Sequence, residues 1–505
     1  MPRVLLTLAL LATLACSRGP ASSQNRGRGV LVIAIDALRY DHTSLGGYDR
    51  KTTPRLADFA EREGVHFSQA WTTGPGLLPA HVSLLTGCDP MVARPPKVVL
   101  SDGEVQPPIR AWFVPPTVPR LAEEFLAEGW STAAFVDHRF LNEERGFNSG
   151  FQTFEGLRDL RENTPRAGLG RSCKALYRWV TDLDEGEDWM AYLHFNDLEL
   201  LWDESEWLGT GHPEIVPAFR PRPALDHVPP VAMRSPSYHA VSPTRLLEGR
   251  PTLAEYEVRY DSALVWVDQQ LDRLLYFLKD SGHLQDTTVV VVGTYGIGFG
   301  ESGFLVDAGS LSDVDLHVPL VIRPAISLGL ETGRTVDALV SLMDLAPTLL
   351  SLYQIPAPQD RVMHGRDMTP LLRGATDTIR PRAYASHGHA EGFCVVDSRW
   401  TYSVTRPGAA GSRSALSRTW YGDERLHRTE EVRVLKDRRA DHKPGILGLG
   451  VGHHAVAADL HAFGEAWYRD LELARDVLHP SPWNADKRTS AVKAELRAKH
   501  LIGEF

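Results

Sequence analysis

Two short apolar runs constrain the fold of this chain more than any other feature. Residues 29–36, GVLVIAID, are apolar throughout and end in an acid, and residues 287–293, TTVVVVG, contain four consecutive valines. Strands that are apolar on both faces are typical of parallel sheets covered by helices on both sides. Functional residues in such sheets lie where strands end. We therefore expect an α/β fold with Asp36 at the functional edge of its sheet.

The segments between these two runs favour the same fold class. Residues 130–137 and 189–197 predict further strands, and residues 117–129 have helical spacing. Residues 251–282 place apolar side chains along one face of a long helix. Alternating strands and helices indicate a large, mostly parallel sheet sandwiched by helices.

Two regions interrupt this alternation. Residues 203–250 are rich in Pro, His and Arg and predict an insertion or long loop. Strand-like pieces such as 392–404, then a polar, Arg-rich stretch and a final helix near 486–500, predict a smaller α+β subdomain. We place that subdomain at residues 381–505 and the main domain at residues 29–380.

The N-terminus has the pattern of an export signal. The apolar run Val4–Ala15 follows a basic residue and is shorter than the roughly 20 residues that span a bilayer. Cys16 after a small residue resembles a bacterial lipobox, although Thr13 stands where Leu is usual, so a plain secretion signal remains open. Residues 1–16 are therefore expected to be a signal peptide and residues 17–28 a flexible tether. We expect a lipoprotein of the bacterial cell envelope, in the periplasm or outer membrane, that contacts the membrane only through a lipid anchor.

Charge and cysteine content indicate neither a nucleic-acid-binding protein nor a disulfide framework. The chain has 64 acidic and 54 basic residues, a net charge of −10, which gives no reason to expect nucleic acid as a partner. Beyond Cys16 only Cys88, Cys173 and Cys394 remain. One disulfide is possible, but three cysteines do not make a disulfide framework.

Six stretches, in order along most of the chain, carry a family resemblance. They are VLVIAIDALRYDHTSLGGYDRKTTPRLADFAEREGVHFSQAWTT (30–73), LLPAHVSLLTG (77–87), GFGESG (298–303), HVPLVIRP (317–324), LVSLMDLAPTLLSL (339–352) and HGRDMTPLLRG (364–374). Together they resemble the sulfatases of the alkaline-phosphatase-like superfamily. The resemblance implies a large sheet sandwiched by helices and a smaller C-terminal sheet. Active members cleave sulfate or phosphate esters with an activated nucleophile, a divalent metal held by carboxylates, and basic side chains for the oxyanion.

The family's nucleophile motif, C-x-P-x-R or T-x-P-x-H, falls on residues 77–81. Pro79 and His81 are retained, whereas Leu77 occupies the position of the nucleophile. Leucine has no heteroatom and cannot attack sulfur or phosphorus. No catalytic nucleophile is therefore assigned.

Most metal-binding positions of the family are also substituted. Asp36 matches the first metal carboxylate, but its neighbour is Ala37, and the D-H-G or D-N-G motif falls on Thr294, Tyr295 and Gly296. Hard cations such as calcium need several anionic oxygen ligands. Asp36 alone would bind a metal weakly, and no cofactor is expected.

Further family histidines are replaced by other side chains. Ser302 stands for one of them and Asp307 aligns with another, whereas His194 and Asp197 match an H-x-x-D-x-H pattern whose last residue is Glu199. Unpaired carboxylates near a sulfate would repel it. Glu199 and Asp307 therefore disfavour an anionic substrate.

These substitutions lead to the interpretation of an exported pseudo-sulfatase that binds a small ligand or a protein partner. The expected cleft residues are Asp36, His81, His194, Asp197, Thr294, Tyr295 and Asp307. The alternative is an active sulfuric or phosphoric ester hydrolase with a displaced nucleophile. Thr72, Thr73 or Ser83 would then act with His81 as base, and calcium or another divalent metal would occupy an unusual site.

Aromatic and histidine residues outside these motifs are expected to lie in surface loops. In and beside the insertion they are Trp202, Trp207, His212, His227 and His239. The histidine pairs in residues 386–392 and 450–456 lack a spaced third ligand, so they are weak indications of a metal.

Overall fold

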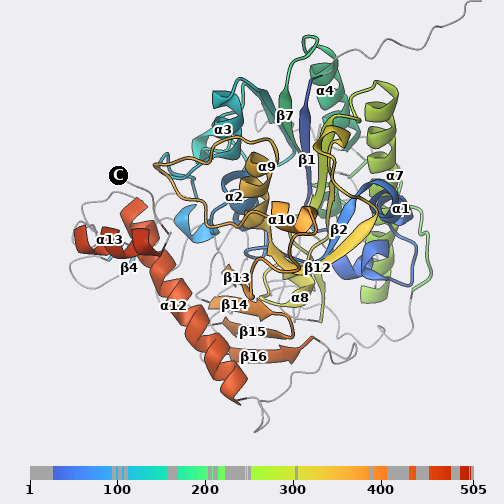
Figure 1. Ribbon diagram of the computed structural model, residues 1–505. Helices are drawn as coiled ribbons and strands as arrows, with labels where there is room; N and C mark the ends of the chain where they lie inside the picture. Colours follow the sequence, from blue (N-terminus) through green and yellow to red (C-terminus); the bar gives the residue numbers. More distant parts are fainter. Residues whose placement is uncertain are drawn as a thin grey trace, which may run out of the picture.

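An eight-stranded sheet forms the centre of the protein (Figure 1). Its strand order is β12-β2-β11-β8-β1-β7-β5-β6, and β1 (Gly29–Ile35) pairs in parallel with β7 (Trp189–Phe195) and β8 (Thr287–Gly293). The computed structural model describes residues 27–93, 98–99, 105–106, 112–156, 169–202, 207–208, 214–221, 245, 247, 252–301, 305–386, 392–405, 432–438, 454–478, 490–499 and 501.

The sheet is parallel except at one strand. Its other strands are β2 (Val65–Trp71), β5 (Ser131–Val136), β6 (Thr153–Gly156), β11 (Leu320–Arg323) and β12 (Arg334–Ser341). Only β11 runs antiparallel to its neighbours, β2 and β8. The predicted fold class, a large and mostly parallel sheet between helices, is confirmed.

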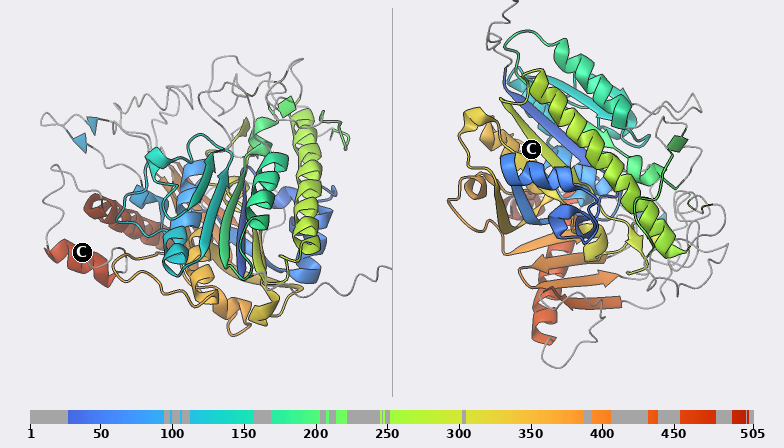
Figure 2. Two further views of the ribbon diagram at one scale, coloured as in Figure 1. Left: turned by 90° about the horizontal axis from the view of Figure 1, so that it is seen from above. Right: turned by 90° about the vertical axis from the view of Figure 1, so that its right-hand side faces the viewer.

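Alternate side chains of the strands face two separate cores. Val30 and Val32 of β1 lie in one core and Leu31 and Ile33 in the other, as the two-residue period of a strand requires. The first core is covered by α2 (Leu77–Thr86), α3 (Leu121–Ala127) and α9 (Leu345–Leu352). The second is covered by α1 (Pro54–Glu63), α4 (Leu169–Thr181) and α7 (Leu253–Asp280). Figure 2 shows the sheet between these helical layers.

The long helix predicted at 251–282 is α7. Its first turn is stabilised by a capping box, because the Thr252 hydroxyl accepts from the Glu255 backbone and the Glu255 carboxylate accepts from the Thr252 backbone. Its buried face includes Tyr256, Tyr260 and Leu264. The strands predicted from the apolar runs also form, which places the end of β1 where the sequence predicts it.

A four-stranded antiparallel sheet follows the main sheet. It consists of β13 (Arg382–Ser386), β14 (Gly392–Asp397), β15 (Trp400–Thr405) and β16 (Val432–Asp437). Two helices follow it, α12 (His454–Leu478) and α13 (Ser490–Ala498), and α12 runs along this sheet (Figure 1). No helix is predicted from the sequence over residues 454–478, where α12 forms. Its buried residues, such as Leu460 and Leu471, recur at helical spacing but are diluted by polar residues.

One imidazole, that of His364, also links the C-terminal end of the described chain to the main domain by hydrogen bonds. His364 Nδ1 accepts the backbone N–H of Asp89 at 3.0 Å, and its Nε2 donates to the carbonyl of Leu501 at 3.1 Å. Asp89 follows α2 in the main domain, so two hydrogen bonds through His364 link Leu501, the last described residue, to the segment after α2.

Several short elements connect the longer ones. The strands are β3 (Val98–Val99), β4 (Val105–Gln106), β9 (Gly298–Phe299) and β10 (Leu305–Asp307), and the helices are α5 (Asp197–Leu200), α8 (Asp313–Leu316) and α10 (Thr369–Leu372). The 3-10 turns are η1 (Tyr40–His42), η2 (Ser44–Gly46), η3 (Pro90–Ala93), η4 (Glu143–Arg145), η7 (Ile326–Leu328) and η8 (Leu342–Asp344).

Some predictions fall partly or wholly outside the described residues. They concern the signal peptide with Cys16, most of the 17–28 tether, His212, His227, His239, Ser302, and most of the histidine loops at 386–392 and 450–456. Among the helices that the structure describes, none combines the length and apolar character needed to cross a bilayer.

Two other expectations are tested directly. Cys88, Cys173 and Cys394 are free thiols, so the possible disulfide does not form. Trp202 and Trp207 are 2% and 1% exposed and belong to the core beneath α7, not to a surface loop. The correction has a simple cause: both indoles pack against aromatic side chains of α7 and so remove a large apolar area from water.

Candidate functional site

Asp36 is the first residue beyond β1, at the carboxyl edge of the sheet. In the neighbouring strand β7, His194 is paired with Ala34, and Thr294 directly follows β8. His81 approaches from α2. All four side chains are 0% exposed. The structure therefore brings together four of the residues predicted for the cleft, and it buries them.

Asp36 accepts three side-chain hydrogen bonds. Its Oδ2 lies 2.9 Å from His194 Nε2. Its Oδ1 lies 3.2 Å from His81 Nε2 and 2.5 Å from the donating hydroxyl of Thr294. A carboxylate bound in this way is held in one orientation and is stabilised in its ionised form.

The partners on the far side of each imidazole fix its hydrogen positions. The backbone N–H of Asp137 donates to His194 Nδ1 at 3.1 Å, so the hydrogen of this ring is on Nε2 and points to Asp36. His81 Nδ1 lies 2.5 Å from the Tyr192 hydroxyl. Because His81 Nε2 must donate to the carboxylate, neutral His81 accepts from Tyr192 at Nδ1. Each hydrogen bond among these side chains then has one donor and one acceptor.

The charge state follows from burial and from these contacts. Burial favours the neutral acid, but attraction and hydrogen bonds from His194 and His81 outweigh it and hold the pKa of Asp36 well below its usual range. Burial and the neighbouring His194 lower the pKa of His81 to about 4. Around neutral pH, Asp36 is therefore a carboxylate and His81 is an uncharged imidazole.

A second group of polar residues stands further out along the same edge. Glu199 of α5 accepts from the Tyr295 hydroxyl at 3.1 Å and pairs with Arg245 at 2.6 Å. Asp307, at the end of β10, lies 3.3 Å from the same Arg245 nitrogen. Burial raises the pKa of Glu199, and Arg245 opposes that shift. The expectation that Glu199 and Asp307 are unpaired is wrong, because Arg245 of the inserted segment forms an ion pair with each of them.

The remaining predicted residues lie on elements around this edge. Asp197 is fully buried at the first position of α5, directly beyond β7. Leu77 is the first residue of α2, preceded by Gly76 at φ 98°, a backbone conformation that favours glycine. The Leu77 side chain is half-buried against both cores and brings no polar atom to the site.

A sulfatase family model matches residues 28–355 of the chain. The chain belongs to the sulfatase family. It is 25% identical over 387 residues to the extracellular sulfatase SULF-1 homolog of Drosophila melanogaster, covering 72% of this chain and 33% of that protein. It is also 25% identical over 455 residues to the steryl-sulfatase of Mus musculus, covering 74% of this chain and 70% of that protein. The match thus spans about a third of the length of the Drosophila relative.

Solved structures show the same fold. A 2-O GAG sulfatase superposes with a TM-score of 0.63 at 18% identity, over 88% of this chain and 93% of the other. The phosphonate monoester hydrolase of Agrobacterium radiobacter gives a TM-score of 0.62 at 18% identity, over 88% and 96%. The alkaline-phosphatase-like architecture predicted from the sequence is therefore confirmed.

The metal that the sulfatase family implies does not fit the residues present. Ligand atoms of Asp36, His81 and His194 lie within 4.8 Å of one another. Calcium takes six to eight oxygen ligands, whereas this group offers one carboxylate. Both Nε2 atoms carry hydrogens directed at that carboxylate, so neither presents a lone pair to a metal.

A second group with possible metal ligands, His42, Glu257 and Asp261, already contains a cation. Arg50 lies 2.6 Å from Asp261. The Tyr48 hydroxyl is 2.8 Å from Glu257 and 2.9 Å from Asp261. These contacts connect the loop after β1 to α7. Because Arg50 supplies the positive charge beside the two carboxylates, the group is a structural ion pair.

The candidates for a displaced sulfatase nucleophile are engaged in structural contacts. Thr72, Thr73 and Ser83 are at most 1% exposed. The hydroxyls of Thr73 and Ser83 lie 2.6 Å apart, and Ser83 also donates to the carbonyl of Cys88 at 2.8 Å. These bonds fix the turn between β2 and α2 and do not present a hydroxyl to a substrate.

Two site residues escaped the sequence-based prediction. Tyr192 precedes His194 by two positions in β7, so both side chains face the same side of the sheet, and strand alternation alone could have identified it. Arg245 lies in the insertion, and no spacing relates it to Glu199 or Asp307.

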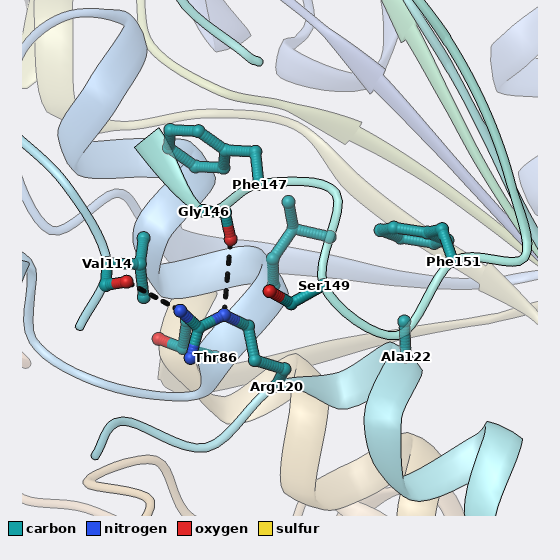
Figure 3. Close-up of a pocket in the computed structure, with 9 residues that line it drawn as sticks. Thr86, Val114, Arg120, Ala122, Gly146, Phe147, Ser149 and Phe151 are labelled. Carbon is teal, nitrogen blue, oxygen red and sulfur yellow. Dashed lines mark hydrogen bonds between the residues drawn. The ribbon is translucent and has the colours of Figure 1, made fainter. Parts of the chain in front are cut away.

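A pocket elsewhere on the domain is distinct from this edge (Figure 3). It is lined by Leu85 and Thr86 at the opposite end of α2 from Leu77, a separation of about 15 Å for a ten-residue helix. In it, Arg120 Nε donates to the carbonyl of Gly146 at 3.2 Å and Nη2 to that of Val114 at 2.6 Å. The Arg120 guanidinium therefore links the loop that contains Val114 to the loop that contains Gly146.

Proposed function

We propose that this chain is a non-catalytic member of the sulfatase family, a pseudo-sulfatase that binds a small ligand or a protein partner. The observation that carries the proposal is the closed set of hydrogen bonds around Asp36. Both carboxylate oxygens are engaged by His81, His194 and Thr294, and all of these side chains are buried.

The chemistry of ester hydrolysis supports the same reading. Hydrolysis by the family route needs a nucleophile whose attack is assisted by a metal or a base. Leu77 supplies no nucleophilic atom, and His81 is committed to Asp36 on one side and Tyr192 on the other. Relatives are named as a 2-O GAG sulfatase and a phosphonate monoester hydrolase. We propose that this chain has kept their architecture and lost their reaction.

The test joins metal analysis with turnover on the purified full chain. Metal content is measured by mass spectrometry, and hydrolysis is measured with a panel of aryl sulfates, phosphates and phosphonates. Variants Asp36→Ala and Tyr276→Ala are run in parallel, since Tyr276 is 69% exposed on α7. We expect no stoichiometric metal and no hydrolysis above that of buffer. Turnover that Asp36→Ala abolishes and Tyr276→Ala retains would refute the proposal.

We also propose export and lipidation at Cys16, supported by the apolar run Val4–Ala15 before it. Expression in a bacterium with a radiolabelled fatty acid tests this directly. Label is expected in the full chain and not in Cys16→Ser. Secretion of both proteins without label would refute lipidation and support a plain secretion signal.

A further inference from the structure

The outer polar group at the carboxyl edge has the form of a receptor for a guanidinium. Arg245 Nη2 lies 2.6 Å from Glu199 Oε2 and 3.3 Å from Asp307 Oδ1. Its Nη1 donates to the carbonyl of Val306 at 2.7 Å. Glu199 of α5 and two groups of β10, the Asp307 carboxylate and the Val306 carbonyl, therefore contact one planar cation.

The acidic side chains are oriented for this cation by their other contacts. The Tyr295 hydroxyl donates to Glu199 Oε1, which leaves Oε2 directed at Arg245. The side chains of Glu199 and Asp307 are only 13% and 10% exposed, so their charges would be costly without a cation between them. Val306 holds its backbone at φ 55°, a strained conformation for a β-branched residue, directly before Asp307.

The group is coupled to the former catalytic position. Tyr295 follows Thr294, whose hydroxyl binds Asp36, and Glu199 lies close enough to Asp36 for the Asp36 charge to raise the Glu199 pKa, after the larger effect of burial. A sulfate ester entering this edge would meet carboxylates and would have to compete with them for Arg245. A cation would instead be attracted by these carboxylates.

We propose that this edge is a guanidinium site whose resident ligand is Arg245 of the same chain, so that the site is self-occupied and selects cations. The inference goes beyond the proposed function because it concerns which group this edge of the sheet binds. It is measured without any turnover assay, so either idea can fail while the other stands.

The experiment is chemical rescue of Arg245→Ala in the full chain. The melting temperature is measured against increasing guanidinium or N-methylguanidinium chloride in the millimolar range, with matched sodium chloride. Arg245→Ala is expected to melt below the parent protein and to recover saturably with guanidinium. The parent protein and Arg273→Ala, which removes an exposed arginine from α7, should show no such recovery.

Two further variants test whether guanidinium acts at this site and not on the protein in general. In Arg245→Ala/Glu199→Gln the rescue should be lost, because the oxygen that faces the cation has lost its charge. If Arg245→Ala does not fold, Arg245→Lys keeps the charge but not the planar guanidinium, and it should melt below the parent protein with a weaker response to guanidinium. Equal melting of the parent protein and the available Arg245 variant, or the same guanidinium response in both, would overturn the proposal.

Discussion

His194 donates its Nε2 hydrogen to Asp36 across 2.9 Å, although the two residues are 158 positions apart in the chain. The Asp137 backbone determines the direction of this bond, because its N–H donates to His194 Nδ1 and so leaves the ring hydrogen on Nε2. A buried carboxylate with matched donors contributes stability, and loss of one donor leaves part of its charge uncompensated.

The first prediction concerns this hydrogen-bonded carboxylate. His194→Ala should lower the free energy of unfolding by about 3 kcal/mol, since it opens a cavity and removes a charged hydrogen bond. Thr294→Val keeps the shape, removes one donor and should cost less, about 1–2 kcal/mol. Equilibrium urea unfolding measures both, with Tyr276→Ala as the exposed control. Thr294→Val equal to or more stable than the parent protein would contradict the hydrogen-bond assignment.

The second prediction is a loss of stability in mild acid. The pKa of His81 is lowered to about 4 in the folded protein, below its unfolded value near 6.5, so the unfolded chain binds its proton first. The resulting stability is complete above pH 6.5 and falls, by up to about 3 kcal/mol, as the pH drops to 4. Asp36 does not contribute to this slope. Its lowered pKa stabilises the folded protein, and that stability is lost only in stronger acid.

Urea unfolding between about pH 7 and pH 5 tests the assignment to His81. His81→Asn should flatten the slope of stability against pH. Burial also lowers the pKa of His317 to about 4, so His317→Asn is the matched comparison and should remove a separate part of the slope. An unchanged slope in His81→Asn would show that His81 is not buried as a neutral ring.

The third prediction has the opposite sign. Asp89 is fully buried beyond α2, and burial raises its pKa to about 7. A raised carboxyl pKa means that the folded protein holds the proton more tightly, so stability falls as the pH rises from about 4 through 7, by up to about 4 kcal/mol. Asp89→Asn should therefore melt above the parent protein at about pH 8 and approach it at about pH 5. The exposed Asp280→Asn on α7 serves as control, and a destabilised Asp89→Asn at the higher pH would exclude a protonated Asp89.

The fourth prediction concerns Leu77, which occupies the nucleophile position of the family's motif. Leu77→Ser restores a hydroxyl at the start of α2, but Asp36 remains closed by three donors, so no ester hydrolysis should appear. The same change should cost about 1–2 kcal/mol, because Leu77 is half-buried. Leu77→Ala is the matched control. Hydrolysis by Leu77→Ser above that of Leu77→Ala would mean that the site is still able to activate a nucleophile.

The sequence predicted the elements that carry the site better than the contacts within it. Asp36, His194 and Thr294 follow or end buried strands, and parallel strands end at one edge, so their proximity was predictable. The proton arrangement was not, because it depends on the Asp137 backbone and the Tyr192 hydroxyl. The pairing of Glu199 with Arg245 was not predictable either, since an ion pair across an insertion leaves no periodic pattern.

Helix α12 illustrates a different limit. Its apolar positions have helical spacing, but polar residues separate them, and no helix was predicted for this segment. Only the surface of β14 and its neighbours, against which Leu460 and Leu471 are buried, shows which face of this helix is apolar.

The His364 imidazole joins Asp89 and the backbone of Leu501, with one nitrogen serving each. Fraying of the chain terminus would thus disturb the segment that follows α2 in the main domain. We expect the two sheets to unfold in a single cooperative transition, and amide exchange at Leu501 to be slower than in an ordinary frayed end.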